Sequence, residues 1–178
     1  MNKIAVIRAG ALGDVVLALP AVSLLRAAFS EAHLRAVGYP AHWAVAGELV
    51  DQIQSIDAAA MAGLLSNSPT EPLQRALGSS DLVVAWTGQD PTSALRTIGV
   101  RRVVHAPPTP PPGVHAARWL LQSLDDLLVE GHREPGSAFD LETWRLLYCE
   151  AELQEGRKLL AELGLNGAGM DENGAVQP

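Results

Sequence analysis

Four residues near the start of the chain have the types and the spacing to form a chemical site. Arg8 ends an apolar run, Gly10 and Gly13 follow it, and Asp14 precedes a long apolar stretch. This order predicts a strand, a tight turn and a helix, the first unit of an open α/β sheet. Ligands bind beyond the carboxyl ends of the strands in such sheets, and glycines let the backbone bend and another molecule approach closely. The turn is therefore a candidate ligand site.

The residues alone leave the roles of Asp14 and Arg8 open. A carboxylate at a helix start caps exposed N–H groups and is stabilised by the helix dipole, so a structural cap is the simpler interpretation of Asp14. Arg8 can form an ion pair with Asp14, end the strand in solvent, or contact a ligand. The spacing Gly-x-x-Gly-Asp lacks the dinucleotide-binding fingerprint, so a generic mononucleotide-binding domain is only a third possibility.

Composition excludes several other functions. The chain has 178 residues, 48% of them hydrophobic, which is enough for one domain with a full core. Its formal net charge of −7 argues against a nucleic-acid partner bound through a basic surface. The single cysteine, Cys149, permits no internal disulfide and fits a reducing compartment. No metal-ligand spacing, Gly-x-Ser-x-Gly turn or P-loop is present, so we expect no metal and no cofactor.

The apolar segment Val15–Leu25 is not interpreted as a signal peptide or a membrane span. Arg8 and Asp14 precede it, Pro20 interrupts it, and no clean cleavage pattern follows. No uninterrupted apolar run has the length that a membrane span needs. We therefore expect a cytoplasmic protein that touches the inner membrane, if at all, peripherally and through its substrate.

The elements that must position the turn alternate between strands and helices. Pro20 is expected to kink or restart the first helix after a short turn at 14–18, since proline cannot donate the helical hydrogen bond. The predicted strands are 3–8, 33–38, 52–56, 81–86 and 102–105. The other predicted helices are 41–50, 58–65, 72–77, 92–98, 114–130 and 140–163. This alternation predicts a Rossmann-like, doubly wound, mainly parallel α/β sheet.

Three further segments lie near the same predicted edge of the sheet. Thr87, Gln89 and Asp90 follow the strand 81–86, whose carboxyl end should meet that of the first strand. The proline-rich segment 106–113 is expected to be an extended, stiff loop beside the site. His115 and Arg118 open the helix that follows, where a solvated first turn explains them as well as a ligand does.

The run from Ile4 to Ala21 resembles the opening of the family 9 glycosyltransferases, the heptosyltransferases that build the lipopolysaccharide inner core. The resemblance is carried by the strand, its basic last residue, the Gly-Asp turn and Leu19-Pro20-Ala21. It implies the N-terminal, acceptor-binding half of a GT-B enzyme that transfers a sugar with inversion and without a metal. It also implies that Asp14 is the catalytic base. The implied substrate-binding residues are Arg8, Gly10, Gly13, Thr87, Gln89, His115 and Arg118.

The resemblance extends from residue 1 to about 165, which we expect to be the acceptor-binding domain, with 166–178 as a disordered tail. The donor-binding domain that follows in the family is expected to be absent. The implied partners are a glycan or glycolipid acceptor and a nucleotide-sugar donor held by a separate domain or partner chain. The alternative is a non-catalytic α/β sugar-binding or interaction domain in which Asp14 is a helix cap.

Overall fold

The computed structural model describes residues 1–130, 154, 157, 158, 161 and 162. The chain divides into two compact units, Met1–Trp144 and Arg145–Pro178. The described residues of the second unit are helical, as predicted for 140–163. Cys149 and the tail predicted for 166–178 lie outside the described residues. Among the residues that the structure describes, none of the helices combines the length and apolarity needed to cross a membrane.

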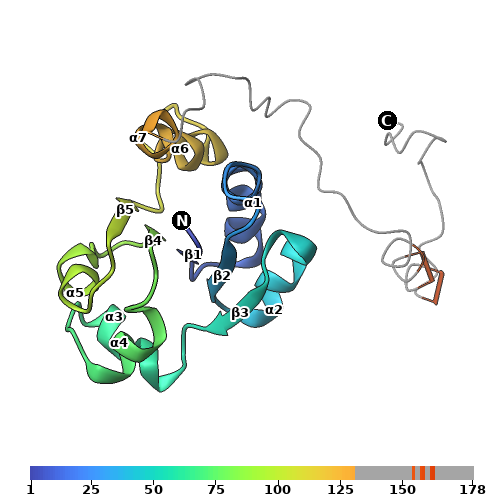
Figure 1. Ribbon diagram of the computed structural model, residues 1–178. Helices are drawn as coiled ribbons and strands as arrows, with labels where there is room; N and C mark the ends of the chain where they lie inside the picture. The colour runs from blue at the N-terminus through green and yellow to red at the C-terminus, as the bar shows by residue number, and fades with distance from the viewer. Residues whose placement is uncertain (131–153, 155–156, 159–160, 163–178) are drawn as a thin grey trace. The chain divides into compact units, whose positions relative to one another are not determined.

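A five-stranded, all-parallel sheet forms the centre of the first unit (Figure 1). Its strands are β1 (Lys3–Ile7), β2 (His33–Gly38), β3 (Gln52–Ser55), β4 (Leu82–Trp86) and β5 (Arg102–Ala106). All five predicted strands are present, and the predicted fold class is confirmed. The order β3-β2-β1-β4-β5 reverses direction between β1 and β4, which is the switch point where doubly wound sheets bind ligands.

Helices cover both faces of this sheet. Figure 1 shows α1 and α6 on one face and α3, α4 and α5 on the other. Over residues 1–130, the helices are α1 (Leu12–Ala28), α2 (Pro40–Trp43), α3 (Ala62–Leu65), α4 (Glu71–Leu77), α5 (Thr92–Thr97), α6 (Ala116–Gln122) and α7 (Asp125–Glu130). The same range contains the 3₁₀ turns η1 (Ala44–Leu49) and η2 (Ala59–Met61). Because the strand order reverses between β1 and β4, right-handed crossovers place the helices of the two halves on opposite faces.

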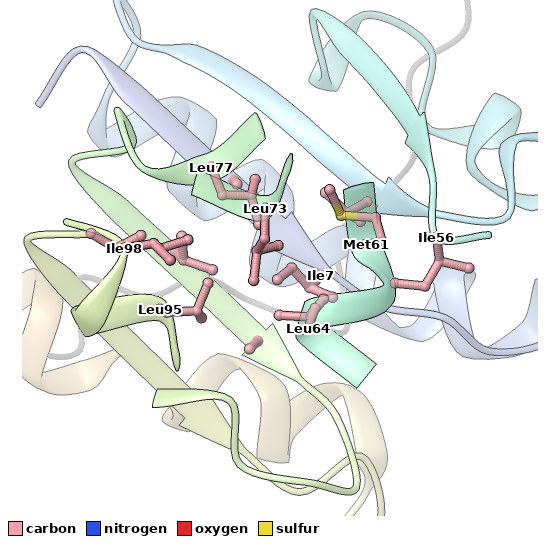
Figure 2. Close-up of a cluster of buried hydrophobic side chains, with 13 residues drawn as sticks. Ile7, Ile56, Met61, Leu64, Leu73, Leu77, Leu95 and Ile98 are labelled. Carbon is pink, nitrogen blue, oxygen red and sulfur yellow. The ribbon is translucent and has the colours of Figure 1, made fainter. Parts of the chain in front are cut away.

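Figure 2 shows the apolar core between the sheet and the second helical layer. Ile7 of β1 and Leu95 of α5 are fully buried there, together with Met61 of η2. The β4 strand is buried along its whole length, as its uninterrupted Leu-Val-Val-Ala-Trp sequence predicts. Burial on both faces holds the carboxyl ends of β1 and β4 side by side, and the candidate site lies at these ends.

The first helix differs from its prediction. It begins at Leu12, two residues earlier than expected, and continues through Pro20 to Ala28 without a restart. Proline removes one hydrogen bond, the one to the carbonyl of Val16. Seven residues of the helix are buried, and their packing outweighs that loss. The buried residues are Val15, Ala18, Leu19, Pro20, Ala21, Val22 and Leu25.

Three other predicted helices are shorter than their patterns indicate. The segment 41–50 is helical only to Trp43, and the η1 turn that follows contains Gly47 at a φ of 50°, outside helical geometry. The segment 58–65 is divided between η2 and α3. The segment 114–130 is divided into α6 and α7 at Ser123. The Ser123 hydroxyl donates to the carbonyl of Leu120, a local bond that competes with the helical ladder.

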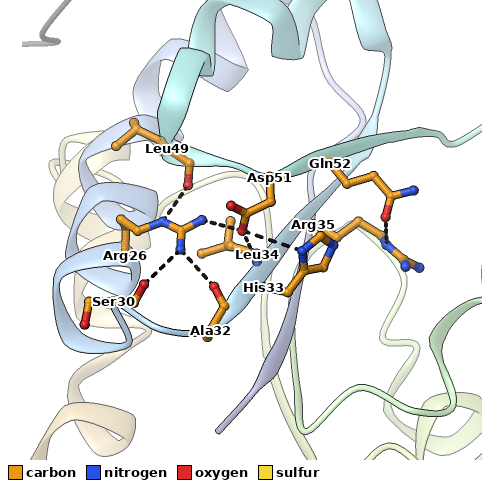
Figure 3. A network of polar contacts seen from close by, with 9 residues as sticks. All are labelled: Arg26, Ser30, Ala32, His33, Leu34, Arg35, Leu49, Asp51 and Gln52. Carbon is orange, nitrogen blue, oxygen red and sulfur yellow. Dashed lines mark hydrogen bonds and ion pairs between the residues drawn. The ribbon is translucent and has the colours of Figure 1, made fainter.

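A polar network ties the end of α1 to the starts of β2 and β3 (Figure 3). The Arg26 guanidinium donates to the carbonyl of Ala32 at 2.8 Å and to Oδ2 of Asp51 at 2.6 Å. The same Asp51 oxygen accepts the backbone N–H of Leu34 at 2.6 Å. The hydrogen bond from Leu34, and then that from Arg26, holds the pKa of Asp51 below its usual range. This network fixes α1, and therefore its N-terminal turn, against the sheet.

Candidate functional site

The backbone of Arg8 is held on both sides at the carboxyl end of β1. Its N–H donates to the carbonyl of Val37 at 3.0 Å and extends the pairing with β2. Its carbonyl accepts the indole N–H of Trp43 at 3.0 Å, and Trp43 is fully buried. Gly38 leaves room for this contact, because a Cβ there would overlap the Trp43 ring and the Arg8 carbonyl. These two hydrogen bonds fix the position of the Arg8 backbone at the end of β1.

Asp14 lies in the first turn of α1, where its two carboxylate oxygens have different partners. Oδ2 accepts the backbone N–H of Ala11 at 2.9 Å, which satisfies one of the free donors at the helix start. Oδ1 accepts Nη2 of Arg8 at 2.8 Å. The side chain is still 41% exposed, so these contacts orient the carboxylate without sealing it. Its place in the first turn of the helix also gives the side chain a favourable interaction with the helix dipole.

Arg8 contrasts with Asp14 because its side chain is only 8% exposed. Nη1 approaches the carbonyl of Trp86 at 3.5 Å, the outer limit of a hydrogen bond. Within the described part of the chain, Nε has no hydrogen-bond partner. A buried donor without an acceptor costs about 1–3 kcal/mol. The ion pair with Asp14 compensates the charge of Arg8 but leaves part of its hydrogen-bonding capacity unused.

The two glycines of the turn differ in the space around them. Neither Gly10 nor Gly13 has a positive φ, so the turn does not depend on their special backbone freedom. A Cβ on Gly10 would lie 2.8 Å from Cγ of Asp14, so this glycine makes room for the carboxylate. A Cβ on Gly13 would meet nothing within 4 Å. The carbonyl of Gly10 also contacts Nδ1 of His42 at 2.9 Å.

A cavity of about 220 Å³ opens at the switch point, between the ends of β1 and β4. Part of its lining is apolar and comes from Ile56, Leu64, Trp86, Pro91 and Pro108. The rest is Arg8, Ala9, Thr87, Gly88 and Gln89. The proline-rich loop therefore does lie beside the site, as predicted, and contributes Pro108. Mostly apolar walls with a few polar groups are typical of small-molecule sites.

The loop after β4, which lines part of the cavity, is anchored by hydrogen bonds within the chain. The Thr87 hydroxyl donates to the carbonyl of Gln89 at 2.7 Å, and Nε2 of His105 contacts the carbonyl of Thr87 at 2.9 Å. Hydrogen bonds from Thr92 hold the pKa of Asp90 below its usual range, and nearby His105 and Arg96 lower it further. These contacts give the cavity wall a fixed shape before a ligand arrives.

The structure brings only some of the predicted site residues together. Arg8, Thr87 and Gln89 line the cavity, while Gly10 and Asp14 belong to the adjoining turn and Gly13 to the exposed side of α1. His115 and Arg118 are exposed at the start of α6 and do not line the cavity. Within the described ranges, no cluster of three or more His, Cys, Asp or Glu side chains has the geometry to hold a metal ion.

The sequence did not predict the residues of neighbouring elements that form hydrogen-bond contacts with the site. His42 and His105 contact the turn and the loop from α2 and β5. The structure also places Trp43 of α2 in the core, where its indole contacts the Arg8 carbonyl. No spacing rule connects these residues to the turn, because α2 and β5 belong to other βα units than the turn does. The pairing of β1 with β2 and of β4 with β5 brings them there.

The fold and the site define a Rossmann-like α/β unit with a preformed cavity at its switch point. The chain is similar in structure to the glycosyl transferase family 9 protein from Veillonella parvula, with a TM-score of 0.58 and 18% sequence identity. This match covers 95% of the present chain and 51% of that protein, so the chain spans about half its length. It confirms the predicted fold, a Rossmann-like unit corresponding to half of a GT-B glycosyltransferase.

A second similar structure is E. coli heptosyltransferase WaaC with ADP-2-deoxy-2-fluoro heptose. Its TM-score is 0.48 at 15% identity, over 91% of this chain and 66% of that one. No family model matches the sequence, and no curated protein matches it either.

Proposed function

We propose that this chain is the acceptor-binding domain of an inverting glycosyltransferase, with Asp14 as the catalytic base. One observation carries the proposal. A part-exposed carboxylate, oriented by the Ala11 N–H and by Arg8, is bonded to Arg8, and Arg8 itself lines a cavity at the switch point of a parallel sheet. The structural similarity to two glycosyltransferases supports this assignment at the level of fold.

In the proposed reaction, Asp14 removes the proton from an acceptor hydroxyl as its oxygen attacks the anomeric carbon of the donor sugar. A carbon–oxygen bond forms on one face of that carbon, and the bond to the nucleotide diphosphate breaks on the other. The proton stays on Asp14 and the negative charge leaves with the diphosphate. Arg8 holds the carboxylate in one orientation through the 2.8 Å ion pair.

In this proposal, the present chain binds the acceptor, and another domain or chain binds the donor. The acceptor is a lipopolysaccharide or another cell-surface glycan, bound by Arg8, Thr87 and Gln89, with His115 and Arg118 as outer contacts. A nucleotide-sugar donor is held by a second domain or a separate chain. The proposed location is cytoplasmic, with peripheral contact to the inner membrane through a lipid-linked acceptor.

A second candidate function is a non-catalytic sugar-binding domain. It is favoured by the fact that both Asp14 oxygens already have partners in the chain, as a purely structural helix cap requires. The two candidates make the same prediction for binding and opposite predictions for transfer.

Sugar transfer by the full chain, mixed with the product of a neighbouring donor-binding reading frame, separates the candidates. Asp14→Asn keeps the size of the side chain but removes the base, so transfer should fall by roughly 10²–10⁴-fold. Asp57→Asn, which changes an exposed aspartate away from the cavity, is the matched control. Binding of an inner-core oligosaccharide, followed by NMR, should stay within about threefold in both variants. Transfer that survives Asp14→Asn shows that the base assignment is wrong.

A further inference from the structure

The cavity at the switch point combines two properties that narrow the class of ligand. Ile56, Leu64 and Trp86 are each at least 96% buried and give it an apolar wall. Arg8 is 94% buried and gives it a cationic donor on the same cavity. A group that fits both must carry an apolar part and an oxygen that accepts hydrogen bonds.

Arg8 has hydrogen-bonding capacity that the chain does not use. A guanidinium has five N–H donors. In the described structure Nη2 is bonded to Asp14, Nη1 makes only a 3.5 Å contact, and Nε has no partner. Nε itself is fully buried, so a ligand oxygen would complete the guanidinium at Nη1, where the chain supplies only the long contact. The buried, incompletely satisfied side chain therefore points to an occupant of the cavity.

The charge balance favours an uncharged oxygen over an anion. The charge of Arg8 is already compensated by Asp14 at 2.8 Å. A carboxylate or phosphate in the cavity would place a second negative charge on one cation, beside walls that are largely apolar. Asp90, in the loop that forms the rim, would add further repulsion. A neutral carbonyl oxygen accepts the same hydrogen bond without these costs.

We infer that the cavity is a subsite for the acetamido group of an N-acetylated amino sugar. The methyl group packs against Ile56 and Leu64, and the carbonyl oxygen accepts from Arg8. The amide N–H has the Gln89 carboxamide within the same lining as a partner. This inference rests on the proposed function, and it specifies the acceptor as a glycan containing an N-acetylhexosamine.

The test is titration of the full chain with N-acetylated sugars and with their parent sugars. The N-acetyl forms of glucosamine, galactosamine and mannosamine are compared with the parent hexoses and with glucuronate, by calorimetry and by amide NMR. At least one N-acetylhexosamine should bind roughly tenfold or more tightly than its parent hexose, because it fills an apolar pocket and satisfies a buried donor. Its shifts should cluster at residues 8, 9 and 86–89.

A variant at Arg8 tests whether this side chain is responsible for the preference for N-acetylated sugars. Arg8→Lys keeps a cation beside Asp14 but removes the planar guanidinium, so it should abolish the preference for the N-acetyl form. Arg35→Lys is the matched control, since Arg35 bonds to Gln52 and Ala76, outside the cavity. The comparison between sugars on the wild-type chain decides the question even where Arg8→Lys folds poorly.

Each other outcome overturns the inference in a recognisable way. Equal binding of an N-acetylhexosamine and its parent hexose at these residues refutes the acetamido subsite and leaves the sugar-binding proposal standing. Tightest binding of glucuronate shows that the subsite takes a carboxylate. If no sugar and no inner-core oligosaccharide shifts these residues, both the inference and the proposed function are wrong.

Discussion

Nη2 of Arg8 lies 2.8 Å from Oδ1 of Asp14, and the two side chains of this pair differ sharply in exposure. Arg8 is 8% exposed, whereas Asp14 is 41% exposed. A cation buried at the end of a central strand thus holds an anion that faces solvent at the start of a helix. The arrangement keeps one carboxylate oriented, as both a base and a helix cap require. It also leaves the carboxylate accessible, as a base requires.

Removing one member of this ion pair should lower the free energy of unfolding more than removing both members. Asp14→Ala leaves a buried guanidinium without its anion and should lower the free energy of unfolding by about 1–3 kcal/mol. The double variant Arg8→Met with Asp14→Ala should recover much of that loss, because no buried charge remains. Urea denaturation of the two single variants and the double variant measures the coupling. Additive losses would show that the ion pair does not contribute to stability.

The two glycines of the turn form a matched pair for substitution. Gly10→Ala places a methyl group against the Asp14 carboxylate and should displace it, lowering stability by about 1–2 kcal/mol and weakening sugar binding. Gly13→Ala enters open space in a helix and should be neutral or stabilise by about 0.5–1 kcal/mol. Thermal unfolding and the sugar titrations measure both. Equal effects at the two positions would contradict the different roles assigned to them.

The indole of Trp43 is expected to contribute to stability through its hydrogen bond as well as its packing. Trp43→Phe removes the donor to the Arg8 carbonyl at a fully buried position and should cost about 1–3 kcal/mol. Trp119→Phe is the control. It removes an equally short bond to Pro107 at a part-exposed position where water can replace the donor, so its cost should be smaller. Similar losses in guanidinium denaturation would show that burial of the bond is unimportant.

Asp51 should make the chain sensitive to acid. Its folded pKa is lowered from 3.8, so its contribution is fully present above that value and is lost as pH falls through the folded pKa. Asp51→Asn should therefore be less stable than the wild type at neutral pH, and the difference should shrink below about pH 4. Denaturation midpoints between pH 7 and pH 2 measure it, with Asp57→Asn as an exposed control. A difference that is constant with pH would contradict the network in Figure 3.

The strand pattern and the position of the first turn were predictable from the sequence because both are local. The central strands β1 and β4 are nearly uninterrupted apolar runs, as burial on both faces of a sheet requires, and all five strands were found within one residue at each end. Helix ends were predicted less well. The restart expected at Pro20 and the single helix expected over 114–130 were wrong, because the packing of α1 and the Ser123 hydroxyl override local propensity.

The sequence by itself determined which residues end the first strand and open the first helix, since periodicity and residue type act over a few positions. Only the tertiary structure decided what surrounds them. The strand order β3-β2-β1-β4-β5 brings Trp43 beneath Arg8 and places the walls of the cavity beside it. It also decided that Arg8 is buried and Asp14 exposed, because exposure depends on elements that pack from distant parts of the chain.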